Sequence, residues 1–297
     1  MPEKDLPKIS IVIPAYNEAE AIGIVLDDVR KAMEELKAPY EIIVVDDDSQ
    51  DSTTEIAKAK GAKLVTHHRN QGSGAARRSG ILAAKGDIVV MLDADGTYAA
   101  SDISAILKPF PEADQVIGAR KVEAGSYPLL RGPAKWLICK LACLLTRQEI
   151  PDLNSGLRAV KREIMLKFLH LLPEGFSCVS TMTLAFLMNG FNVVFVPCEY
   201  RSRIGNSKFH PIKDTYNYLI TVVRMVMYFD PLRILMPISI VIGILGFLKG
   251  IFDFFYTGTL QESDIILMLF SINLAAIGVL GDLLARREKA KILKKDE

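Results

Sequence analysis

Carboxylate side chains gather at the ends of two short apolar segments of the chain. Asp46, Asp47 and Asp48 end or follow the segment EIIVVD, and Asp93 and Asp95 follow DIVVML. A single aspartate in such a place is common, because its side chain bonds turn amides. Several carboxylates together repel one another unless a cation or hydrogen-bond donors offset their charge. The Asp93-x-Asp95 spacing presents two oxygen ligands on one face of an extended segment, which suits a hard divalent cation that also holds phosphates.

Basic and small polar side chains gather later in the sequence. They are Arg120, Arg131, the segment Asp152-Leu-Asn-Ser155-Gly-Leu-Arg158 and the segment Arg203-Ile-Gly-Asn-Ser-Lys208. Guanidinium groups offer two parallel donors to a phosphate. Each arginine alone is most simply a solvated surface charge. Together with the Ser and Gly turn residues, the cluster indicates a phosphate site.

The elements that must position these residues are short strands that alternate with helices. Apolar, β-branched runs predict strands at Lys8–Ile13, Glu41–Asp46, Ala62–Thr66, Asp87–Leu92 and Gln115–Gly118. Helical spacing lies between them, at Ala19–Leu36, Ser52–Lys60, Gly74–Lys85 and Ser101–Phe110. This order predicts an α/β domain with a mostly parallel sheet. Ligands of such sheets bind outside the carboxyl ends of the strands, which is where the carboxylates follow.

A glycine-rich turn precedes the third predicted helix. Gly72-Ser73-Gly74 begins a GxGxxG pattern, but Arg77 stands where the last glycine would be, and the turn follows the third strand instead of the first. A dinucleotide-binding fingerprint is therefore disfavoured. The amides of such a turn can still bind an anion, and Arg77 and Arg78 add positive charge.

Charge is unevenly distributed along the 297 residues. Lys plus Arg number 36 and Asp plus Glu number 35, and the net charge of +1 argues against a nucleic-acid partner found through bulk charge. The 54 residues from Leu232 to Ala285 carry only six charged side chains. Within them Ile234–Leu248 and Ile265–Gly281 are almost wholly apolar. A helix of about 20 apolar residues crosses a bilayer, so the two runs predict two transmembrane helices, at about 232–254 and 264–285. Two buried helices of a soluble domain are the alternative, but core helices usually keep a polar face.

Basic residues flank this apolar hairpin on one side only. Arg224 and Arg233 precede the first run and Arg286 and Arg287 follow the second, whereas the connection 257–263 has no Lys or Arg. By the positive-inside rule, both ends and the N-terminal region face the cytoplasm. The predicted organisation is a cytoplasmic domain over residues 1–210, a juxtamembrane amphipathic helix over 211–231, the hairpin over 232–285 and a basic cytoplasmic tail over 286–297.

Four motifs occur in an order that resembles the family 2 glycosyltransferases. They are PAYNE at 14–18, VVDDDS at 44–49, NQGSGAARRSGI at 70–81 and MLDADG at 91–96. With the two later segments and the hairpin, the chain is most similar to the polyprenyl-phosphate glycosyltransferases, of which the dolichyl-phosphate mannose synthases are the best-known type. The resemblance implies a GT-A fold, which is a nucleotide-sugar-binding α/β domain.

The resemblance implies a donor site at the strand ends. Its residues would be Pro14, Tyr16, Glu18, Asp46, Asp47 and Asp93. Asp93 and Asp95 would hold Mg²⁺ or Mn²⁺ on the donor diphosphate. The mannose synthases commonly continue DAD with Leu-Gln, whereas Gly96-Thr97 stands here, so the third metal ligand is left open.

The resemblance also implies an acceptor-phosphate site. Its residues would be Arg120, Arg131, Ser155, Arg203 and Lys208. Asp152 would be the catalytic carboxylate beside Asp93 and Asp95, and by analogy it is the candidate base. A phosphate monoester is already largely dianionic near neutral pH and needs positioning more than deprotonation. We therefore expect Asp152 to orient the acceptor groups or the sugar.

The predicted function is an inverting transfer of one sugar from a UDP- or GDP-linked donor to dolichyl or undecaprenyl phosphate at the cytoplasmic membrane face. The inversion comes from the resemblance. One alternative is a polysaccharide synthase of the same fold, although no QxxRW-like element precedes the first span and two spans make a poor channel. The other is a catalytically silent membrane protein that binds nucleotide sugars. Gly243, Gly246 and Gly250 allow close helix packing, which leaves a homo-oligomer open.

Overall fold

The computed structural model describes residues 8–120, 140, 142–143, 146, 148–175, 177–204 and 211–293, and the side chains of 211–215, 217–218 and 291–293 are outside this description. By its internal contacts the chain divides into two compact units, residues 1–222 and 223–297. Each unit is described by itself below. Arg131 and Lys208, predicted to bind the acceptor phosphate, lie outside the described residues.

Among the described residues, seven strands form one mixed sheet in the order β3-β2-β1-β4-β6-β5-β7. The strands are β1 (Ile9–Ala15), β2 (Tyr40–Asp46), β3 (Lys63–Thr66), β4 (Ile88–Met91), β5 (Gln115–Arg120), β6 (Arg158–Lys161) and β7 (Val193–Cys198). The first four are parallel, as is the β5–β7 pair, whereas β6 runs antiparallel to both β4 and β5. The predicted mostly parallel α/β sheet is confirmed. Strands β6 and β7 were not among the predicted strands, nor was the insertion of β6 between β4 and β5.

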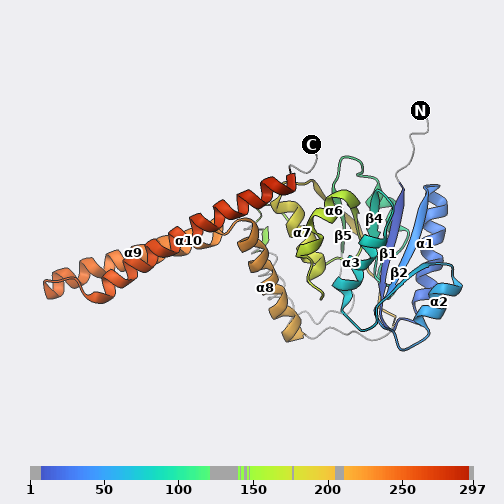
Figure 1. The fold of residues 1–297 in the computed structure, drawn as a ribbon, viewed down its shortest axis with the longest axis horizontal. Helices are drawn as coiled ribbons and strands as arrows, with labels where there is room; N and C mark the ends of the chain where they lie inside the picture. The colour runs from blue at the N-terminus through green and yellow to red at the C-terminus, as the bar shows by residue number, and fades with distance from the viewer. Residues whose placement is uncertain are drawn as a thin grey trace. The chain divides into compact units, whose positions relative to one another are not determined.

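Helices cover both faces of the sheet (Figure 1). They are α1 (Ile22–Leu36), α2 (Thr53–Ala59), α3 (Ser73–Ala83), α4 (Asp102–Leu107), α6 (Arg162–Phe168) and α7 (Cys178–Met188), with a short 3₁₀ turn at Leu169–Leu171. Successive side chains of β1 point to opposite faces of the sheet, as strand geometry requires. Ile11 and Ile13 belong to the core that includes Leu26 of α1. Val12 meets α3, where a Cβ added to Gly80 would lie 2.2 Å from Val12 Cγ1, so only glycine lets this helix approach so closely.

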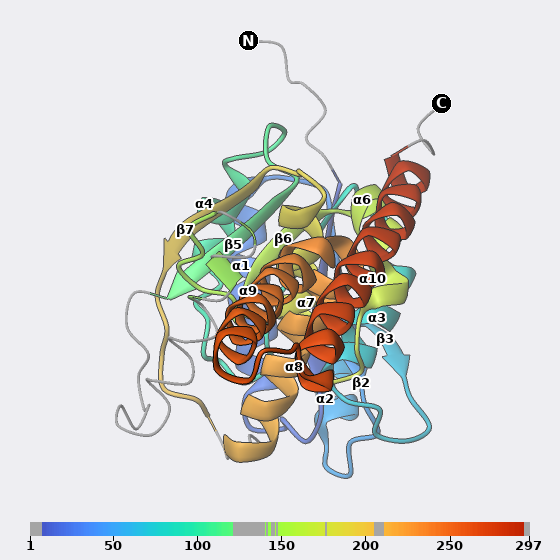
Figure 2. The same ribbon diagram turned by 90° about the vertical axis from the view of Figure 1, so that its left-hand side faces the viewer.

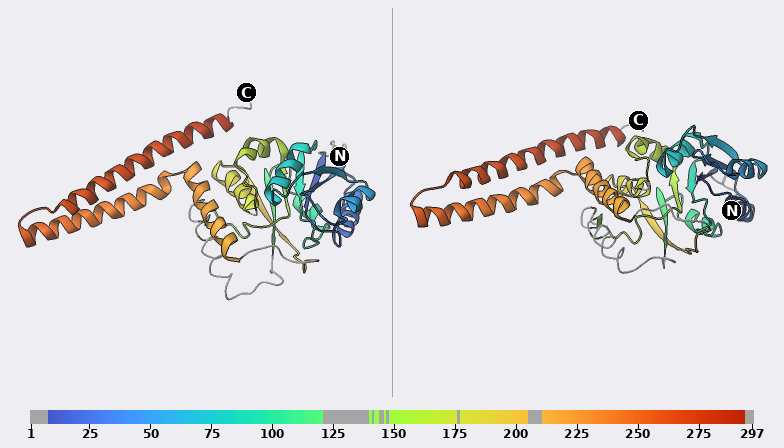
Figure 3. Two further views of the ribbon diagram at one scale, coloured as in Figure 1. Left: turned by 60° about the horizontal axis from the view of Figure 1, so that its bottom comes forward. Right: turned by 90° about the horizontal axis from the view of Figure 1, so that it is seen from below.

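The C-terminal unit contains a helical hairpin, and its helices α9 (Leu232–Thr257) and α10 (Glu262–Leu293) lie side by side (Figures 2 and 3). A further helix, α8 (Pro211–Phe229), precedes them and crosses the boundary between the units. Both hairpin helices are long and apolar enough to cross a membrane. Their contact uses small residues: a Cβ on Gly246 would lie 2.9 Å from Leu267 Cβ, and one on Gly243 2.7 Å from Ser271 Oγ. The predicted two-helix hairpin is confirmed.

Ion pairs stand at both ends of the hairpin's apolar segments. At the connecting end, Lys249 Nζ donates to Asp253 and to Asp264, each at 2.6 Å. At the other end, Asp282 accepts from Arg286 at 2.7 Å, and Arg233 pairs with Asp230 at 2.8 Å. Charged groups in or near a bilayer are costly unless paired. Each of these charged side chains therefore has a partner of opposite charge.

Candidate active site

The turns after β1 and β2 are joined by hydrogen bonds into one wall at the carboxyl edge of the sheet. Asn17, with a left-handed φ of 51°, donates its amide to Ser49 Oγ at 2.9 Å. Its side-chain oxygen accepts from the Gln50 amide at 2.7 Å. The Glu18 amide donates to Thr53 Oγ1 at 2.9 Å. The segment that carries Pro14, Tyr16 and Glu18 is therefore fixed to the aspartate-rich turn after β2, as the strand order predicts.

Asp46 keeps unused hydrogen-bonding capacity at this edge. The residue is buried, with 5% of its surface exposed. Its Oδ2 accepts from Thr54 Oγ1 at 2.8 Å and from the Ser49 amide at 3.4 Å. Its Oδ1 is buried without a hydrogen-bond partner among the described residues. Since buried polar atoms are nearly always satisfied, this oxygen suits a donor group on a bound ligand.

Asp47 is placed differently, because both of its oxygens are used by the protein. Its Oδ1 lies 2.6 Å from His67 Nδ1 and accepts from the Gln71 amide at 3.0 Å. Its Oδ2 accepts from the Gly72 amide at 2.7 Å. The carboxylate therefore ties the turn after β2 to the loop after β3. His67 was assigned no role from the sequence.

The glycines before α3 serve a close backbone contact. The Gly74 and Ala75 amides donate to the carbonyl of Glu174, at 2.7 and 3.2 Å. A Cβ on Gly72 would lie 2.6 Å from that oxygen, and one on Gly74 would lie 2.1 Å from the Pro173 carbonyl. These amides are thus taken by the protein. The structure gives the turn a packing role in place of the anion-binding role that its glycines allow.

Asp93 is held by an arginine of α3. Arg77, of which 5% is exposed, makes a short ion pair through Nη2 with Asp93 Oδ1, and its Nη1 donates to the Ser73 carbonyl at 3.2 Å. On the other side of Asp93, a Cβ added to Gly156 would lie 2.1 Å from Oδ2. Asp93 therefore sits between α3 and the Asp152–Arg158 segment. The sequence indicated Arg77 only as added positive charge, and its pairing with Asp93 was missed.

Asp95 is buried with partners on both oxygens. Thr97 donates to Oδ1 through its amide at 3.1 Å and its hydroxyl at 2.6 Å. Arg203 Nε lies 3.5 Å from Oδ2, and Arg203 Nη2 donates to Glu18 at 2.6 Å. Burial and the neighbouring charge of Asp93 raise the pKa of Asp95. A cation placed here would relieve both effects.

The Asp93–Asp95 pair could hold a metal ion whose other coordination positions are filled by a bound substrate and water. Among the described residues, no group of three or more His, Cys, Asp or Glu side chains is arranged to hold a metal ion. Two carboxylates with a raised pKa at Asp95 suit a hard cation whose remaining ligands are phosphate oxygens and water. The hydroxyl of Thr97, the residue at which the third metal ligand was left open, donates to Asp95 Oδ1 at 2.6 Å.

Asp152 and Arg120 form a buried bidentate pair. Arg120 Nε donates to Asp152 Oδ2 at 2.6 Å, and Nη2 donates to Oδ1 at 2.9 Å. The Arg120 guanidinium also lies over the Tyr200 ring, 5.1 Å from its centroid. Asp152 is only 3% exposed, and the Asn154 amide donates to it at 3.0 Å. The carboxylate therefore fixes the orientation of the arginine.

The rest of the Asp152–Arg158 segment is a buried turn. Ser155 is fully buried, with its hydroxyl 3.4 Å from that of Tyr98, and the Gly156 amide donates to the Tyr98 hydroxyl at 2.8 Å. Arg158 is also fully buried and donates to the carbonyls of Ser155 and Val179. Burial lowers the pKa of Arg158 to about 10, which leaves it charged near neutral pH. Ser155 and Arg158 therefore shape the turn that presents Asp152.

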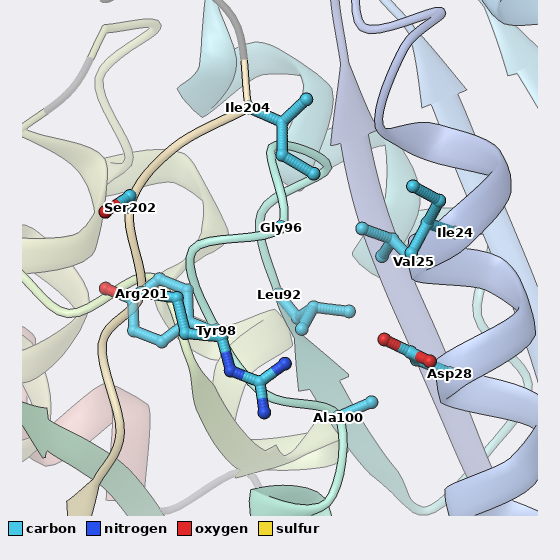
Figure 4. Close-up of a pocket in the computed structure, with 10 residues that line it drawn as sticks. All are labelled: Ile24, Val25, Asp28, Leu92, Gly96, Tyr98, Ala100, Arg201, Ser202 and Ile204. Atoms are coloured by element: carbon cyan, nitrogen blue, oxygen red, sulfur yellow. The ribbon is translucent and has the colours of Figure 1, made fainter.

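The segment after β7 pairs with the Asp95 turn. Arg201 donates its amide to the Thr97 carbonyl at 2.8 Å, and Ile204 donates to the Asp95 carbonyl at 3.1 Å. Ile204 also lies against Gly96, whose φ is +72°. A cavity of about 160 Å³ borders this contact (Figure 4). Its lining residues are Ile24, Val25, Asp28, Leu92, Gly96, Tyr98, Ala100, Arg201, Ser202 and Ile204. The pairing brings Arg203 to Glu18 and Asp95.

The structure thus brings most predicted site residues to one edge of the sheet. Glu18, Asp95 and Arg203 meet directly. Asp93 lies beside Gly156 of the segment that carries Asp152, and Asp152 pairs with Arg120 of β5. The assignment of each residue to donor, metal or acceptor remains a prediction.

Two family models match the chain. Glycosyl transferase family 2 matches residues 10–168, and the GtrB C-terminal hairpin matches residues 230–286. The first covers the sheet through β6 and α6, and the second covers most of α9 and α10.

Relatives and solved structures agree with these matches. A dolichyl-phosphate hexose transferase of Haloferax volcanii is 30% identical over 71% of this chain and 90% of its own length. An undecaprenyl-phosphate 4-deoxy-4-formamido-L-arabinose transferase of Aeromonas hydrophila is 28% identical over 96% of this chain and 91% of its own. The glucosyl-3-phosphoglycerate synthase of Mycobacterium tuberculosis, in complex with Mn²⁺, UDP and its product, shares the fold with a TM-score of 0.59 at 21% identity, over 74% of this chain and 80% of that one. The chain therefore belongs to glycosyl transferase family 2.

Proposed function

We propose that this protein is a polyprenyl-phosphate glycosyltransferase that transfers one sugar from a UDP- or GDP-linked donor to dolichyl or undecaprenyl phosphate, with inversion. The observation that carries the proposal is the pairing of the segment after β7 with the Asp95 turn, which brings Arg203 to within 3.5 Å of Asp95. The carboxylates proposed for the donor diphosphate would therefore lie next to the basic residues proposed for the acceptor phosphate. The two relatives named above are polyprenyl-phosphate transferases by name.

The donor would bind at the wall formed by the turns after β1 and β2. Asp46 Oδ1, which has no partner among the described residues, would accept from an N–H or hydroxyl of the nucleoside. Pro14, Tyr16 and Glu18 would line the same wall. Asp93 and Asp95 would hold Mg²⁺ or Mn²⁺, which neutralises charge on the leaving nucleoside diphosphate when bound. The fold neighbour that holds Mn²⁺ and UDP supports this divalent-metal proposal.

The acceptor phosphate would bind at Arg120, oriented by Asp152, with Arg203 entering from the segment after β7. Arg131 and Lys208 belong to the acceptor set predicted from the sequence, whereas Ser155 of that set is fully buried and would contribute only through the turn that presents Asp152. The bidentate Arg120–Asp152 pair keeps the guanidinium in one orientation, which suits planar recognition of a phosphate oxygen pair. A dianionic phosphate needs no general base, so Asp152 acts through Arg120.

The membrane side of the reaction is also a proposal. Two apolar helices make this a membrane protein, and the matched hairpin family supports the same conclusion. The basic residues that flank the hairpin favour a catalytic domain on the cytoplasmic side. A Thr259→Cys variant in the connection between α9 and α10 tests this. In sealed inside-out vesicles, an impermeant thiol reagent should fail to label Cys at this position, and labelling would contradict the proposed orientation.

The activity is tested by offering labelled UDP- and GDP-sugars in parallel to the purified protein in vesicles that contain polyprenyl phosphate and Mg²⁺ or Mn²⁺. One label should become extractable into organic solvent. Asp95→Ala should abolish this transfer, and Glu35→Ala, at an exposed position of α1, is the control and should retain it. Equal transfer by the wild type and Asp95→Ala would contradict the metal-site proposal.

A further inference from the structure

A buried hydrogen-bonded relay joins β2, β3 and α3 next to the proposed nucleoside site. His67, one residue beyond β3, lies with Nδ1 2.6 Å from Asp47 Oδ1 and Nε2 2.9 Å from Ser79 Oγ. The side chains of His67 and Asp47 are only 8% and 4% exposed. When Nδ1 carries the proton, it donates to Asp47, and Nε2 accepts from the Ser79 hydroxyl.

The relay fixes a loop as well as a side chain. Asp47, oriented by His67, accepts the amides of Gln71 and Gly72 at 3.0 and 2.7 Å. The His67 amide donates to the Asp46 carbonyl at 2.9 Å, so the loop after β3 is bound to the turn after β2 at two places. The same turn carries Asp46, whose Oδ1 is the unpartnered acceptor described above.

The Ser–His–Asp order has the connectivity of a hydrolytic triad, but the surroundings do not support nucleophilic catalysis. Ser79 is the seventh residue of the eleven-residue helix α3. The amides around it are used by the helix, so none is left to stabilise an oxyanion. The relay is instead built to hold the loop in place.

We propose that His67 is a positioning residue for nucleotide binding: through Asp47 it holds residues 69–72 as a wall of the nucleoside site beside Asp46. The proposal rests on the proposed function, because it needs a nucleotide at this edge of the sheet. His67 itself does not touch the nucleotide. Its effect passes through the Asp47 carboxylate to the Gln71 and Gly72 amides.

Two substitutions separate the halves of the relay. In His67→Asn the side-chain amide replaces Nδ1–H and keeps the bond to Asp47, whereas in His67→Gln it replaces Nε2 and keeps only the contact with Ser79. His68→Gln makes the same change at the neighbouring, exposed histidine and is the matched control. Thermal unfolding of each variant confirms that it is folded.

Two measurements are made on the full-length protein in detergent. Hydrogen exchange of the Gln71 and Gly72 amides should accelerate about tenfold or more in His67→Gln, because Asp47 loses its hydrogen bond to residue 67 and holds the two amides less firmly. Exchange should stay near the wild-type rate in His67→Asn, which keeps that bond. Calorimetric titration with UDP and with GDP, each with Mn²⁺, should show about tenfold weaker binding of the preferred nucleotide to His67→Gln. His67→Asn and His68→Gln should bind like the wild type.

Equal exchange rates and equal nucleotide affinities in His67→Asn and His67→Gln would overturn the relay while leaving the proposed function intact. If the wild type bound neither nucleotide, the proposed function and the nucleotide role of the relay would both fail. Faster exchange in His67→Gln without weaker nucleotide binding would overturn the positioning role, because the loop would then be held without consequence for the ligand.

Discussion

The carboxylate of Asp152 holds the guanidinium of Arg120 through two parallel hydrogen bonds, of 2.6 and 2.9 Å. Both oxygens of the carboxylate are engaged, and the residue is almost wholly buried. A carboxylate in this arrangement is a poor general base, because taking up a proton would cost it a charge-assisted bond to the arginine. The geometry supports the expectation that Asp152 orients an acceptor group.

Asp152→Asn should therefore raise the KM for polyprenyl phosphate by about tenfold, because an amide turns one of the two acceptors into a donor that faces the guanidinium. The KM for the donor should change little. Rates measured from neutral to alkaline pH should show the same defect throughout. Recovery of the rate at high pH would instead indicate a base. Asp27→Asn, which breaks the surface pair with Lys60, is the matched control.

Asp95→Asn should raise the stability of the metal-free protein while removing its response to metal. Because burial and Asp93 raise the pKa of Asp95, the folded protein keeps a proton at pH values where the unfolded chain has released it. The ionised Asp95 therefore lowers wild-type stability above its folded-state pKa. This penalty should be relieved as pH falls through that pKa toward the ordinary aspartate value, and the variant should not show this pH dependence. A gain of about 1 kcal/mol corresponds to about 2–4 °C in Tm. Thermal unfolding with and without Mn²⁺ and nucleotide checks both effects. An unchanged Tm with an unchanged metal response would contradict the assignment.

Arg77→Lys should impair transfer by about a hundredfold without unfolding the protein. A lysine offers one compact charge and cannot serve Asp93 and the Ser73 carbonyl with the planar geometry of a guanidinium. Misplacement of a group that positions the reacting atoms costs about this much. Initial rates of lipid-linked sugar formation measure the defect. Arg78→Lys, at the exposed neighbouring position, should be active, and equal activity of the two variants would show that Asp93 needs no such support.

Gly246→Leu should separate the hairpin helices. A Cβ there would already lie 2.9 Å from Leu267 Cβ, so a larger side chain has no room. Overpacking of this kind costs about 1–3 kcal/mol. The thermal midpoint in detergent should fall, whereas Val241→Leu, on an exposed part of α9, should leave it unchanged. A normal midpoint in Gly246→Leu would mean that the two helices pack differently.

The sequence predicted the parts of the fold that local pattern determines. Strand β4 was predicted from a continuous apolar run that stops just before Asp93. Helices α9 and α10 were predicted from the two apolar runs near the C-terminus. Strand β6 was missed because its four residues, Arg158–Lys161, carry charge at both ends and read as a turn. Only the fold shows that Arg158 is buried there.

The different roles of neighbouring residues were also beyond the sequence. Asp46, Asp47 and Asp48 have identical side chains. They meet different partners because successive side chains along an extended segment point in different directions. Asp46 Oδ1 has no hydrogen-bond partner in the part of the chain that the structure describes, Asp47 is bonded to the loop after β3, and Asp48 adopts a left-handed φ of 67°. Likewise the bond from Arg203 to Glu18 joins residues 185 positions apart, which no local pattern encodes.

The ammonium group of Lys249 lies against two carboxylates, those of Asp253 and Asp264, near the connecting end of the hairpin. Exposed apolar side chains continue beyond Lys249 on α9, at Ile251, Phe252, Phe254 and Phe255. The three charges therefore lie within the apolar surface of α9 and not at its end. Charged groups in such surroundings are costly unless they are paired. Loss of Lys249 alone would leave two carboxylates there without their cation, so the three residues act as one unit that the hairpin keeps or loses together.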